Sequence, residues 1–365
     1  MLRKGNASII RPPKGVLLIQ LGDIGDIVLS FPCARAVRER FPQAHITMAV
    51  RPKAGDLLGC CPFVDETIWV DDQKKSLCKT IRSQLSFFHQ LRKRGFDLSI
   101  DLRTGTRGAI LGYLSGAPRR LGFFATGEAF WRNGLFTDLA LPFEPESKHI
   151  AHSYAGLLKD FGFIITHPWP KMIVPDAVAL KTIKNVSLAR ANIDTPLVVI
   201  QPFSLWRYKE WGDEKVIDLI RNIVTKTNAT VIIVGSPTER ERAEAIVSQS
   251  PAGVLSWAGQ TTLAELTGLL ACADLFIGVD SAGMHIAAAV GTATVTIFGP
   301  SSAKDWAPRG EIHTAVTPDW PCSPCFQKGC RNSGISECLL QLPVSPVLEA
   351  VMNRLGKKSS KWSTV

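Results

Sequence analysis

The sequence lacks a membrane-spanning stretch and a recognisable secretory leader. No apolar run approaches the roughly 18 residues that cross a bilayer, and the longest candidate, residues 16–21, has the length of a β-strand. The basic residues near the N-terminus are not followed by an apolar region and a small-residue cleavage site. We therefore expect a cytoplasmic protein. Its nine cysteines are then expected to be reduced thiols rather than a disulfide framework.

Several motifs that would define a reaction or a partner are also missing. There is no G-x-G-x-x-G fingerprint, so a nicotinamide or flavin oxidoreductase loses its main sequence support. No His-Glu-x-x-His, Gly-x-Ser-x-Gly or Asp-x-Asp motif occurs, and the last would hold a metal on a nucleotide-sugar diphosphate. No basic motif interleaved with aromatic residues indicates nucleic-acid binding. The sequence predicts neither a cofactor nor a nucleic-acid partner.

What is present is enough apolar material for two domains. The chain has 365 residues, of which 45% are hydrophobic, and domains commonly have about 100–200 residues each. Short apolar runs alternate with amphipathic stretches, which is typical of parallel sheets covered by helices. Strands are predicted at residues 16–21, 46–50, 67–70, 98–102, 197–201, 231–235, 275–279 and 294–298, and helices at 33–41, 215–226 and 239–248. The fold class is α/β, with two doubly wound domains at residues 1–175 and 176–365.

The positive charge is concentrated in the first half of the chain. Residues 1–175 contain 24 Lys and Arg against 15 Asp and Glu, a net charge of +9, whereas residues 176–365 carry +1. This asymmetry favours an anionic partner of the first domain, whether nucleic acid, an acidic membrane surface or a phosphorylated substrate. The alternative is that the charge serves solubility alone.

Two segments follow predicted strands, where open α/β sheets bind ligands. Gly22-Asp23-Ile24-Gly25-Asp26 permits a tight turn and a close approach to a ligand, although its aspartates could simply cap the next helix. The second segment, residues 202–211, contains Ser204, Arg207 and Lys209, and a hydroxyl with two cations suits a phosphate clamp. The alternative is a solvated basic loop over packed tryptophans.

The most informative segment follows the strand predicted at residues 275–279. Asp280 ends this strand, and the small residues Ser281, Ala282 and Gly283 open a helix whose free N–H groups form an anion site suited to a diphosphate. Asp280 and His285 would flank that site. Read alone, a histidine beside an alanine-rich helix is more often a packed core residue.

Four cysteines near the C-terminus have the spacing C-x2-C-x4-C-x7-C. Cys322, Cys325, Cys330 and Cys338 lie within 17 residues and are candidate ligands of Zn²⁺ or an iron–sulfur cluster. The second pair is spaced too loosely for a C-x2-C…C-x2-C ribbon. Reduced, packed thiols are the alternative, and the sequence predicts no catalytic metal.

Together these segments resemble glycosyltransferase family 9, the ADP-heptose:lipopolysaccharide heptosyltransferases. The resemblance rests on residues 18–29 as the opening strand, loop and helix, on Phe96-Asp97-Leu98-Ser99-Ile100-Asp101-Leu102-Arg103, and on residues 278–285 with Ile297-Phe298-Gly299-Pro300. The cysteine cluster also resembles a segment common in the family. The likeness runs from about residue 15 to residue 355.

The resemblance implies a GT-B fold, with the acceptor bound by the first domain and an ADP-sugar by the second. It implies an inverting, metal-independent transfer of heptose to the anionic inner core of lipopolysaccharide, by a cytoplasmic enzyme peripheral to the inner membrane. Asp26 matches the family's general base, Ser204 and Lys209 its diphosphate loop, and Glu239 its nucleoside contact. Asp280 and His285 match its sugar-diphosphate pocket.

Two departures from the family pattern concern the donor. Pro202-Phe203-Ser204 stands where Pro-Gly-Ser is common, and Ser281-Ala282-Gly283 stands where Gly-Pro often follows the hydroxyl residue. Both changes leave another nucleotide or another sugar as an alternative. A non-catalytic sugar-nucleotide-binding protein is the alternative from a different functional class.

Overall fold

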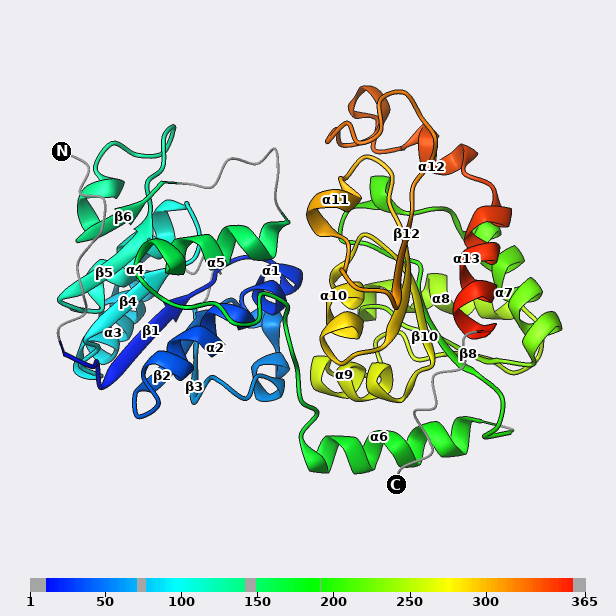
Figure 1. Ribbon diagram of the computed structural model, residues 1–365, viewed down its shortest axis with the longest axis horizontal. Helices are drawn as coiled ribbons and strands as arrows, with labels where there is room; N and C mark the ends of the chain where they lie inside the picture. Colours follow the sequence, from blue (N-terminus) through cyan, green and yellow to red (C-terminus); the bar gives the residue numbers. More distant parts are fainter. Residues whose placement is uncertain (1–10, 71–76, 142–148, 191, 357–365) are drawn as a thin grey trace. The chain divides into compact units, whose positions relative to one another are not determined.

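The computed structural model describes residues 11–70, 77–141, 149–190 and 192–356. The chain divides into two compact units, residues 1–171 and 172–365, each built around its own sheet (Figure 1). This division falls four residues before the predicted boundary at 175. Within the described residues, no helix is both long and apolar enough to cross a membrane.

The first unit contains a parallel six-stranded sheet in the order β3-β2-β1-β4-β5-β6. Its strands are β1 (Gly15–Ile19), β2 (His45–Val50), β3 (Glu66–Trp69), β4 (Leu98–Asp101), β5 (Arg119–Phe123) and β6 (Asp138–Ala140). β1 is central, with Val16 paired to Ile46 of β2 and to Leu98 of β4. Covered on both faces, β1 is apolar along its length and its residues 16–19 are fully buried.

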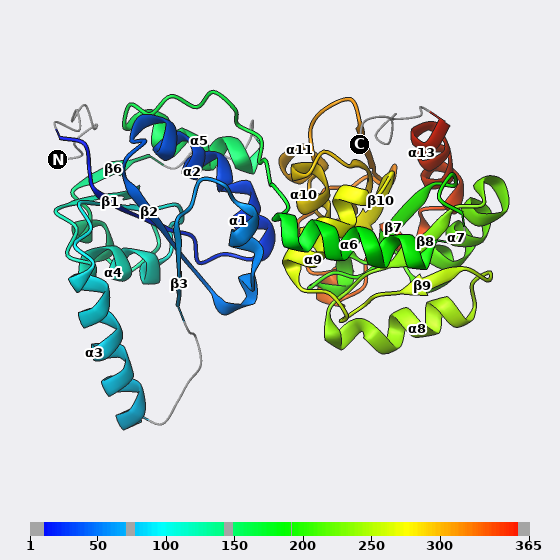
Figure 2. The ribbon, with the colours of Figure 1, turned by 90° about the horizontal axis from the view of Figure 1, so that it is seen from below.

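Helices cover both faces of this sheet. They are α1 (Ile24–Leu29), α2 (Phe31–Arg40), α3 (Leu77–Lys93), α4 (Thr106–Leu114) and α5 (Ile150–Asp160), with short 3-10 turns η1 (Pro52–Ala54), η2 (Leu57–Cys60) and η3 (Arg132–Leu135). Figure 2 shows α2 and α5 on one side of the strands and α3 and α4 on the other, with α1 at the strand ends. α5 packs against α1 and α2, so residues distant in sequence meet near the start of α1.

The second unit repeats the same topology. Its order, β12-β11-β10-β7-β8-β9, is that of the first sheet counted from the other edge. The strands are β7 (Leu197–Gln201), β8 (Thr230–Ile233), β9 (Val254–Ser256), β10 (Leu275–Val279), β11 (Ala293–Ile297) and β12 (His313–Val316). The helices and turns are α6 (Asp176–Ala189), η5 (Arg207–Lys209), α7 (Asp213–Thr227), η6 (Pro237–Glu239), α8 (Arg240–Ser248), α9 (Leu263–Cys272), α10 (Ala282–Ala289), α11 (Ala303–Trp306), η7 (Cys330–Asn332), α12 (Glu337–Gln341) and α13 (Val344–Gly356).

The strand order determines where a ligand site forms in each unit. Both sheets have the Rossmann order, in which the chain reverses direction across the sheet between the first and fourth strands. These strands are β1 and β4 in the first unit, and β7 and β10 in the second. Loops leaving the carboxyl ends of such a pair diverge to opposite faces and leave a crevice. All three predicted ligand segments therefore follow strands at these switch points, namely β1, β7 and β10.

The predicted α/β class with parallel sheets is confirmed. β7 and β10 match their predicted bounds, and the other predicted strands overlap β1, β2, β3, β4, β8 and β11. Four strands were not predicted. β6, β9 and β12 are edge strands of three or four residues, and β5 begins with two arginines, so none forms an apolar run long enough to be recognised.

Trp211 is the largest fully buried side chain of the second core. It is 1% exposed, and its indole Nε1 donates to the Leu342 carbonyl oxygen at 3.0 Å, which joins the start of α7 to the segment before α13. Trp206, five residues earlier, is 46% exposed. We expect Trp211→Ala to lower the free energy of unfolding of this unit by about 3–5 kcal/mol. Trp206→Ala should change it by less than about 1 kcal/mol. Urea unfolding of the two variants measures both values, and equal effects would contradict this packing.

Candidate functional site

The first site is built around Asp26, where β1 turns into α1. Asp23 is the N-cap residue of α1 and Asp26 is its third residue, so the two form a capping box. The Asp23 backbone N–H donates to Asp26 Oδ2 at 3.0 Å. The two aspartates therefore cap the helix, as the simpler interpretation of this segment expected. Asp26 also contacts polar side chains from other elements, as a functional residue would.

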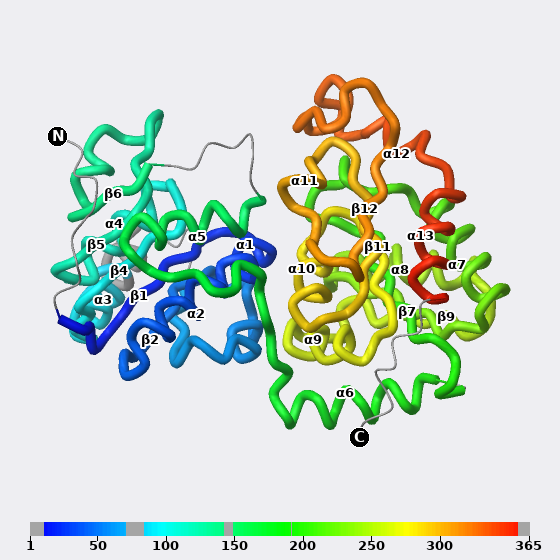
Figure 3. The backbone as a smooth tube through the Cα atoms, viewed as in Figure 1, coloured from blue at the N-terminus to red at the C-terminus, as the bar shows by residue number. Residues whose placement is uncertain are grey.

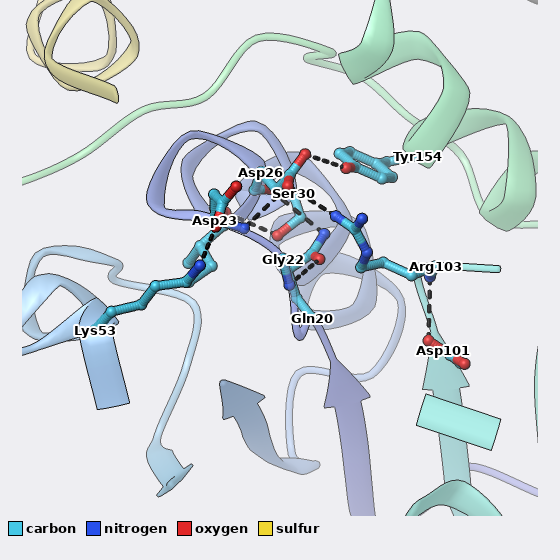
Figure 4. Close-up of polar contacts among 10 residues, drawn as sticks. Gln20, Gly22, Asp23, Asp26, Ser30, Lys53, Asp101, Arg103 and Tyr154 are labelled. Carbon is cyan, nitrogen blue, oxygen red and sulfur yellow. Dashed lines mark hydrogen bonds and ion pairs between the residues drawn. The ribbon is translucent and has the colours of Figure 1, made fainter. Parts of the chain in front are cut away.

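Three donors converge on the Asp26 carboxylate, the nearby Asp23 N–H and two side chains from distant parts of the unit (Figure 4). Arg103 Nη1 donates to Oδ2 at 2.7 Å and forms an ion pair with it. The Tyr154 hydroxyl donates to Oδ1 at 2.7 Å. A carboxylate has about four lone-pair positions, so three donors leave room for one further hydrogen bond.

Tyr154 remains a donor over the physiological pH range. Burial, reinforced by the negative charge of Asp26, raises the pKa of this phenol well above its ordinary value. Its hydroxyl proton therefore stays in place and fixes one carboxylate oxygen. Asp26 itself is mostly shielded, since 13% of its side chain is exposed, compared with 42% for Arg103.

Gly22 makes this arrangement sterically possible. A Cβ atom at this position would lie 2.4 Å from Arg103 Nη1 and 2.4 Å from Asp26 Oδ2. Such distances are far inside van der Waals contact, so any side chain here would separate the guanidinium from the carboxylate. The Gly22 backbone N–H donates to Gln20 Oε1 at 3.1 Å, which holds the turn closed.

A pocket of about 320 Å³ lies beside the Asp26 cluster. It is lined by residues that follow β1, β2, β4 and β5, among them Asp23, Arg51, Asp101, Arg103, Arg107 and Glu128. Three of these are arginines and three are acidic residues, so the guanidinium groups can pair with anionic groups of a ligand in a pocket lined by charges of both signs. Asp23, 54% exposed at its side chain, forms an ion pair with Lys53.

Asp101 lies at the buried end of β4 and is 2% exposed. Its Oδ1 accepts the Arg103 backbone N–H at 3.1 Å, while Oδ2 has no hydrogen bond and lies 3.9 Å from Arg132 Nη2. Burial raises the pKa of Asp101 to about 7, against the opposing effects of the Arg103 N–H and the nearby guanidinium charges. The carboxyl therefore titrates near neutral pH.

The second site lies in the other unit and joins the loop after β7 to the end of β10. Lys209 Nζ forms an ion pair with Asp280 Oδ2 at 2.6 Å. The Ser204 hydroxyl donates to the Asp280 backbone oxygen at 3.1 Å. The structure thus brings together three residues that the sequence placed in separate motifs.

The start of α10 completes this second cluster. Ser281 is the N-cap, and Ala282 and Gly283 are the first two helical residues. Two side-chain oxygens at this helix start, Ser281 Oγ and Gln201 Oε1, are buried without a hydrogen-bond partner among the residues that the structure describes. A Cβ atom on Gly283 would lie 1.9 Å from Gln201 Oε1, so only glycine permits this approach. His285 is 4% exposed, with its ring 6.5 Å from that of Trp306.

The remaining predicted residues of the second site are less closely connected. Glu239 ends η6 and accepts the Ser236 backbone N–H at 2.6 Å in a capping box at the carboxyl end of β8. Arg207 is exposed on η5. A larger pocket of about 520 Å³ lies between α6 and α9 and is lined by Trp257 and Thr261, but by none of the predicted site residues.

Three of the four candidate metal ligands lie in the looped segment between β12 and α12 (Figure 3), and the fourth, Cys338, is the second residue of α12. Cys322, Cys325, Cys330 and Cys338 are free thiols, and the Glu337 backbone N–H donates to Cys330 Sγ at 3.4 Å. Across the residues that the structure describes, no group of three or more His, Cys, Asp or Glu side chains is placed to hold a metal ion. The geometry gives the metal interpretation no support.

Three residues of the first site were not among the predicted functional residues. Asp101 ends β4, the switch-point partner of β1, and Arg103 follows it, so their position at a strand end was a usable signal. Tyr154 lies 128 residues from Asp26 on α5. No local pattern indicates that residue, because only the packing of α5 against α1 brings it to the carboxylate.

Comparison with known proteins identifies the family. The family model described as Glycosyltransferase family 9 (heptosyltransferase) matches residues 84–336, more than two thirds of the chain. The chain belongs to glycosyltransferase family 9, the heptosyltransferases, and is therefore a glycosyltransferase. The resemblance inferred from the sequence motifs is confirmed.

Individual relatives agree along most of the chain. The lipopolysaccharide core heptosyltransferase OpsX of Haemophilus influenzae is 26% identical over 84% of this chain and 84% of its own. The crystal structure of a family 9 glycosyltransferase from Veillonella parvula has a TM-score of 0.79 at 19% identity, covering 94% of this chain and 98% of that one. ADP-heptose LPS heptosyltransferase II of Escherichia coli has a TM-score of 0.76 at 22% identity, with coverages of 93% and 98%. These likenesses confirm the GT-B class of fold.

The pKa of Asp101 gives a prediction about stability. From its ordinary value of 3.8 up to about 7, the folded protein binds this proton more tightly than the unfolded chain does. Ionisation of Asp101 therefore lowers the free energy of unfolding as pH rises through this range. Asp101→Asn removes the titration, so we expect the variant to gain on the order of 3 kcal/mol relative to wild type between pH 4 and 7.

Urea unfolding at a series of pH values measures this difference. Loss of the Arg132 ion-pair partner adds an offset that does not depend on pH, so the slope is the diagnostic quantity. Parallel pH dependence in wild type and variant would show that Asp101 is already ionised at low pH in the folded protein.

Proposed function

We propose that the protein is an inverting glycosyltransferase that moves heptose from ADP-heptose to the inner core of lipopolysaccharide. Membership of family 9 supports the reaction class. The donor and acceptor are inferred from relatives, since the E. coli enzyme is named for ADP-heptose and OpsX for the lipopolysaccharide core. The observation that carries the proposal is the Asp26 carboxylate, held by three donors, one of which is the guanidinium of the pocket-lining Arg103.

In this reaction Asp26 acts as the general base. The acceptor hydroxyl oxygen bonds to the anomeric carbon from the face opposite the diphosphate, the bond from that carbon to the diphosphate breaks, and the hydroxyl proton passes to Asp26. The remaining lone-pair position on the carboxylate receives the acceptor hydroxyl. Arg103 and Tyr154 hold the carboxylate in one orientation, which positions the base before the acceptor arrives.

The leaving group is stabilised by the second cluster. Negative charge grows on the diphosphate as the glycosidic bond breaks, and preorganised cations and N–H groups stabilise it most in the transition state. Lys209 supplies the cation, and Asp280 holds its ammonium group in position. The free N–H groups at the start of α10 supply the helix N-terminus. With these protein groups on the diphosphate, the reaction needs no metal.

The acceptor belongs to the first unit. Inner-core lipopolysaccharide is rich in phosphates and carboxylates, and the pocket beside Asp26 is lined by Arg51, Arg103 and Arg107. The excess charge of +9 over residues 1–175 attracts such an acceptor. Because that acceptor is anchored in a membrane, we infer that the protein works at the cytoplasmic face of the inner membrane as a peripheral protein.

The role of Asp26 is tested by comparing two aspartates of one turn. Asp26→Asn keeps the size of the side chain but removes the base, and should lower kcat by about 10²–10⁴ with donor affinity nearly unchanged. Asp23→Asn is the matched control, because the Asp23 side chain caps the helix and pairs with Lys53, and only its backbone N–H, which the substitution retains, contacts the Asp26 carboxylate. It should cost far less. Transfer from radiolabelled ADP-heptose to core oligosaccharide measures both.

Two outcomes would contradict this assignment. A larger loss in Asp23→Asn than in Asp26→Asn would make Asp23 the base. Donor binding by the wild-type protein without any transfer would support the non-catalytic alternative.

Lys209→Ala should lower kcat by about 10²–10³, because the cation acts on charge that develops in the transition state. Lys209→Arg should restore little, since a planar guanidinium does not replace a compact ammonium group at this position. Lys226→Ala, which removes an exposed lysine from the last turn of α7, serves as the control and should leave kcat unchanged. Steady-state kinetics separate the possibilities, because a raised KM with normal kcat would mean that Lys209 only binds the ground state.

A further inference from the structure

The loop between β5 and η3 exposes two adjacent aromatic residues. Phe130 is 95% exposed, the highest value among the large hydrophobic side chains described, and Trp131 is 41% exposed. We refer to this pair as the aromatic tip. Single exposed hydrophobic residues are common on soluble proteins. The exposure of Phe130 and Trp131 alone therefore does not identify a binding surface, and the residues around the aromatic tip have to be considered as well.

The aromatic tip is held in place by a buried anchor. Arg132, the next residue, is fully buried and donates to the backbone oxygens of Phe123 at 2.7 Å and Arg103 at 3.1 Å. Asn133 closes the loop, with its side chain accepting the Ala125 N–H at 3.2 Å and donating to the Ala125 oxygen at 2.9 Å. These bonds fix the residues on both sides of the tip, so Phe130 is presented to solvent by a well-bonded loop.

The same anchor connects the aromatic tip to the pocket beside Asp26. The Arg103 backbone that accepts from Arg132 belongs to the residue whose guanidinium binds Asp26. Glu128, two residues before the tip, lines the pocket and accepts a hydrogen bond from the Thr106 hydroxyl at 2.7 Å. The tip therefore extends from the wall of the pocket that we assign to the acceptor.

The size and charge of this region select its partner. A stable protein interface buries at least about 1,200 Å², whereas two aromatic side chains supply only about 300–500 Å². A lipid surface needs no extended complementary patch, since phenylalanine and tryptophan partition into the interfacial layer and cations are attracted to anionic headgroups. The unit that carries the tip has an excess of positive charge, and the exposed Arg107 lines the adjacent pocket.

We propose that Phe130 and Trp131 insert into the surface of an anionic lipid bilayer and place the adjacent pocket at headgroup level. The inference deepens the proposed function, on which it rests for the lipid-anchored nature of the acceptor. When the aromatic tip is inserted, the acceptor can reach the pocket without leaving the membrane surface, because Glu128 of the pocket wall lies on the same loop as the tip.

The first test is binding to vesicles of phosphatidylethanolamine containing about a quarter phosphatidylglycerol. Replacing both aromatic residues, Phe130→Ser with Trp131→Ser, should weaken co-sedimentation with these vesicles by roughly tenfold or more. Leu188→Ser is the matched control, because Leu188 is 78% exposed on α6 of the other unit and should change binding less than about twofold. Should the double variant not fold, Phe130→Ser alone gives the same test at a side chain with almost no contacts.

The second test compares transfer to two acceptors. The double variant should retain kcat/KM on delipidated core oligosaccharide and lose about tenfold on the same acceptor embedded in vesicles. Vesicle binding requires no sugar transfer, so an inactive wild type would refute the proposed function while the binding assay still decides the role of the tip. Equal vesicle binding by wild type and double variant would overturn the proposal. So would loss of a solution oligomer in the double variant with vesicle binding unchanged, which would make the tip a protein interface.

Discussion

The parallel pairing of β1 with β4 is the constraint on which the first site depends. These strands lie far apart in sequence, yet their register places residue 19 beside residue 101, and the loops that follow leave the sheet together. One loop leads into α1, which carries Asp26, and the other carries Arg103. The ion pair between these side chains spans 77 positions of sequence and exists only because the strands are neighbours. The same relation between β7 and β10 brings Lys209 to Asp280 in the second unit.

In each site a carboxylate that is largely buried pairs with a cationic side chain: Asp26 with Arg103, and Asp280 with Lys209. Buried charges are stable only when they are paired and hydrogen-bonded, and each cluster meets that requirement with residues from several elements. Asp101 is the partial exception, because one of its oxygens has no hydrogen bond and the nearest guanidinium nitrogen is 3.9 Å away. The protein accepts this cost at the pocket wall, where groups with shifted pKa values are characteristic of functional sites.

Much of this arrangement could be predicted from the sequence, because its signals were local. Apolar runs located eight strands, and the three predicted ligand segments all follow strands at the switch points, although the sequence placed residues 204 and 209 in one segment and residue 280 in another. What could not be predicted came from tertiary packing. Tyr154 reaches Asp26 through the docking of α5, and short edge strands such as β6 and β9 are stabilised by neighbours rather than by their own composition. The thiols of the cysteine segment, although suggestively spaced, are not arranged as a metal site.

Gly22 is a position at which the effect of a substitution is easily underestimated. It carries no functional group, and its backbone is not in the left-handed region, so by the usual criteria for glycine it would be tolerant. Yet the volume of a missing methyl group is what allows a guanidinium and a carboxylate to meet beside it. An alanine there would behave as a defect of the reacting centre in a chain that folds normally. The site thus includes an empty space among its working parts, and a survey restricted to polar side chains would overlook it.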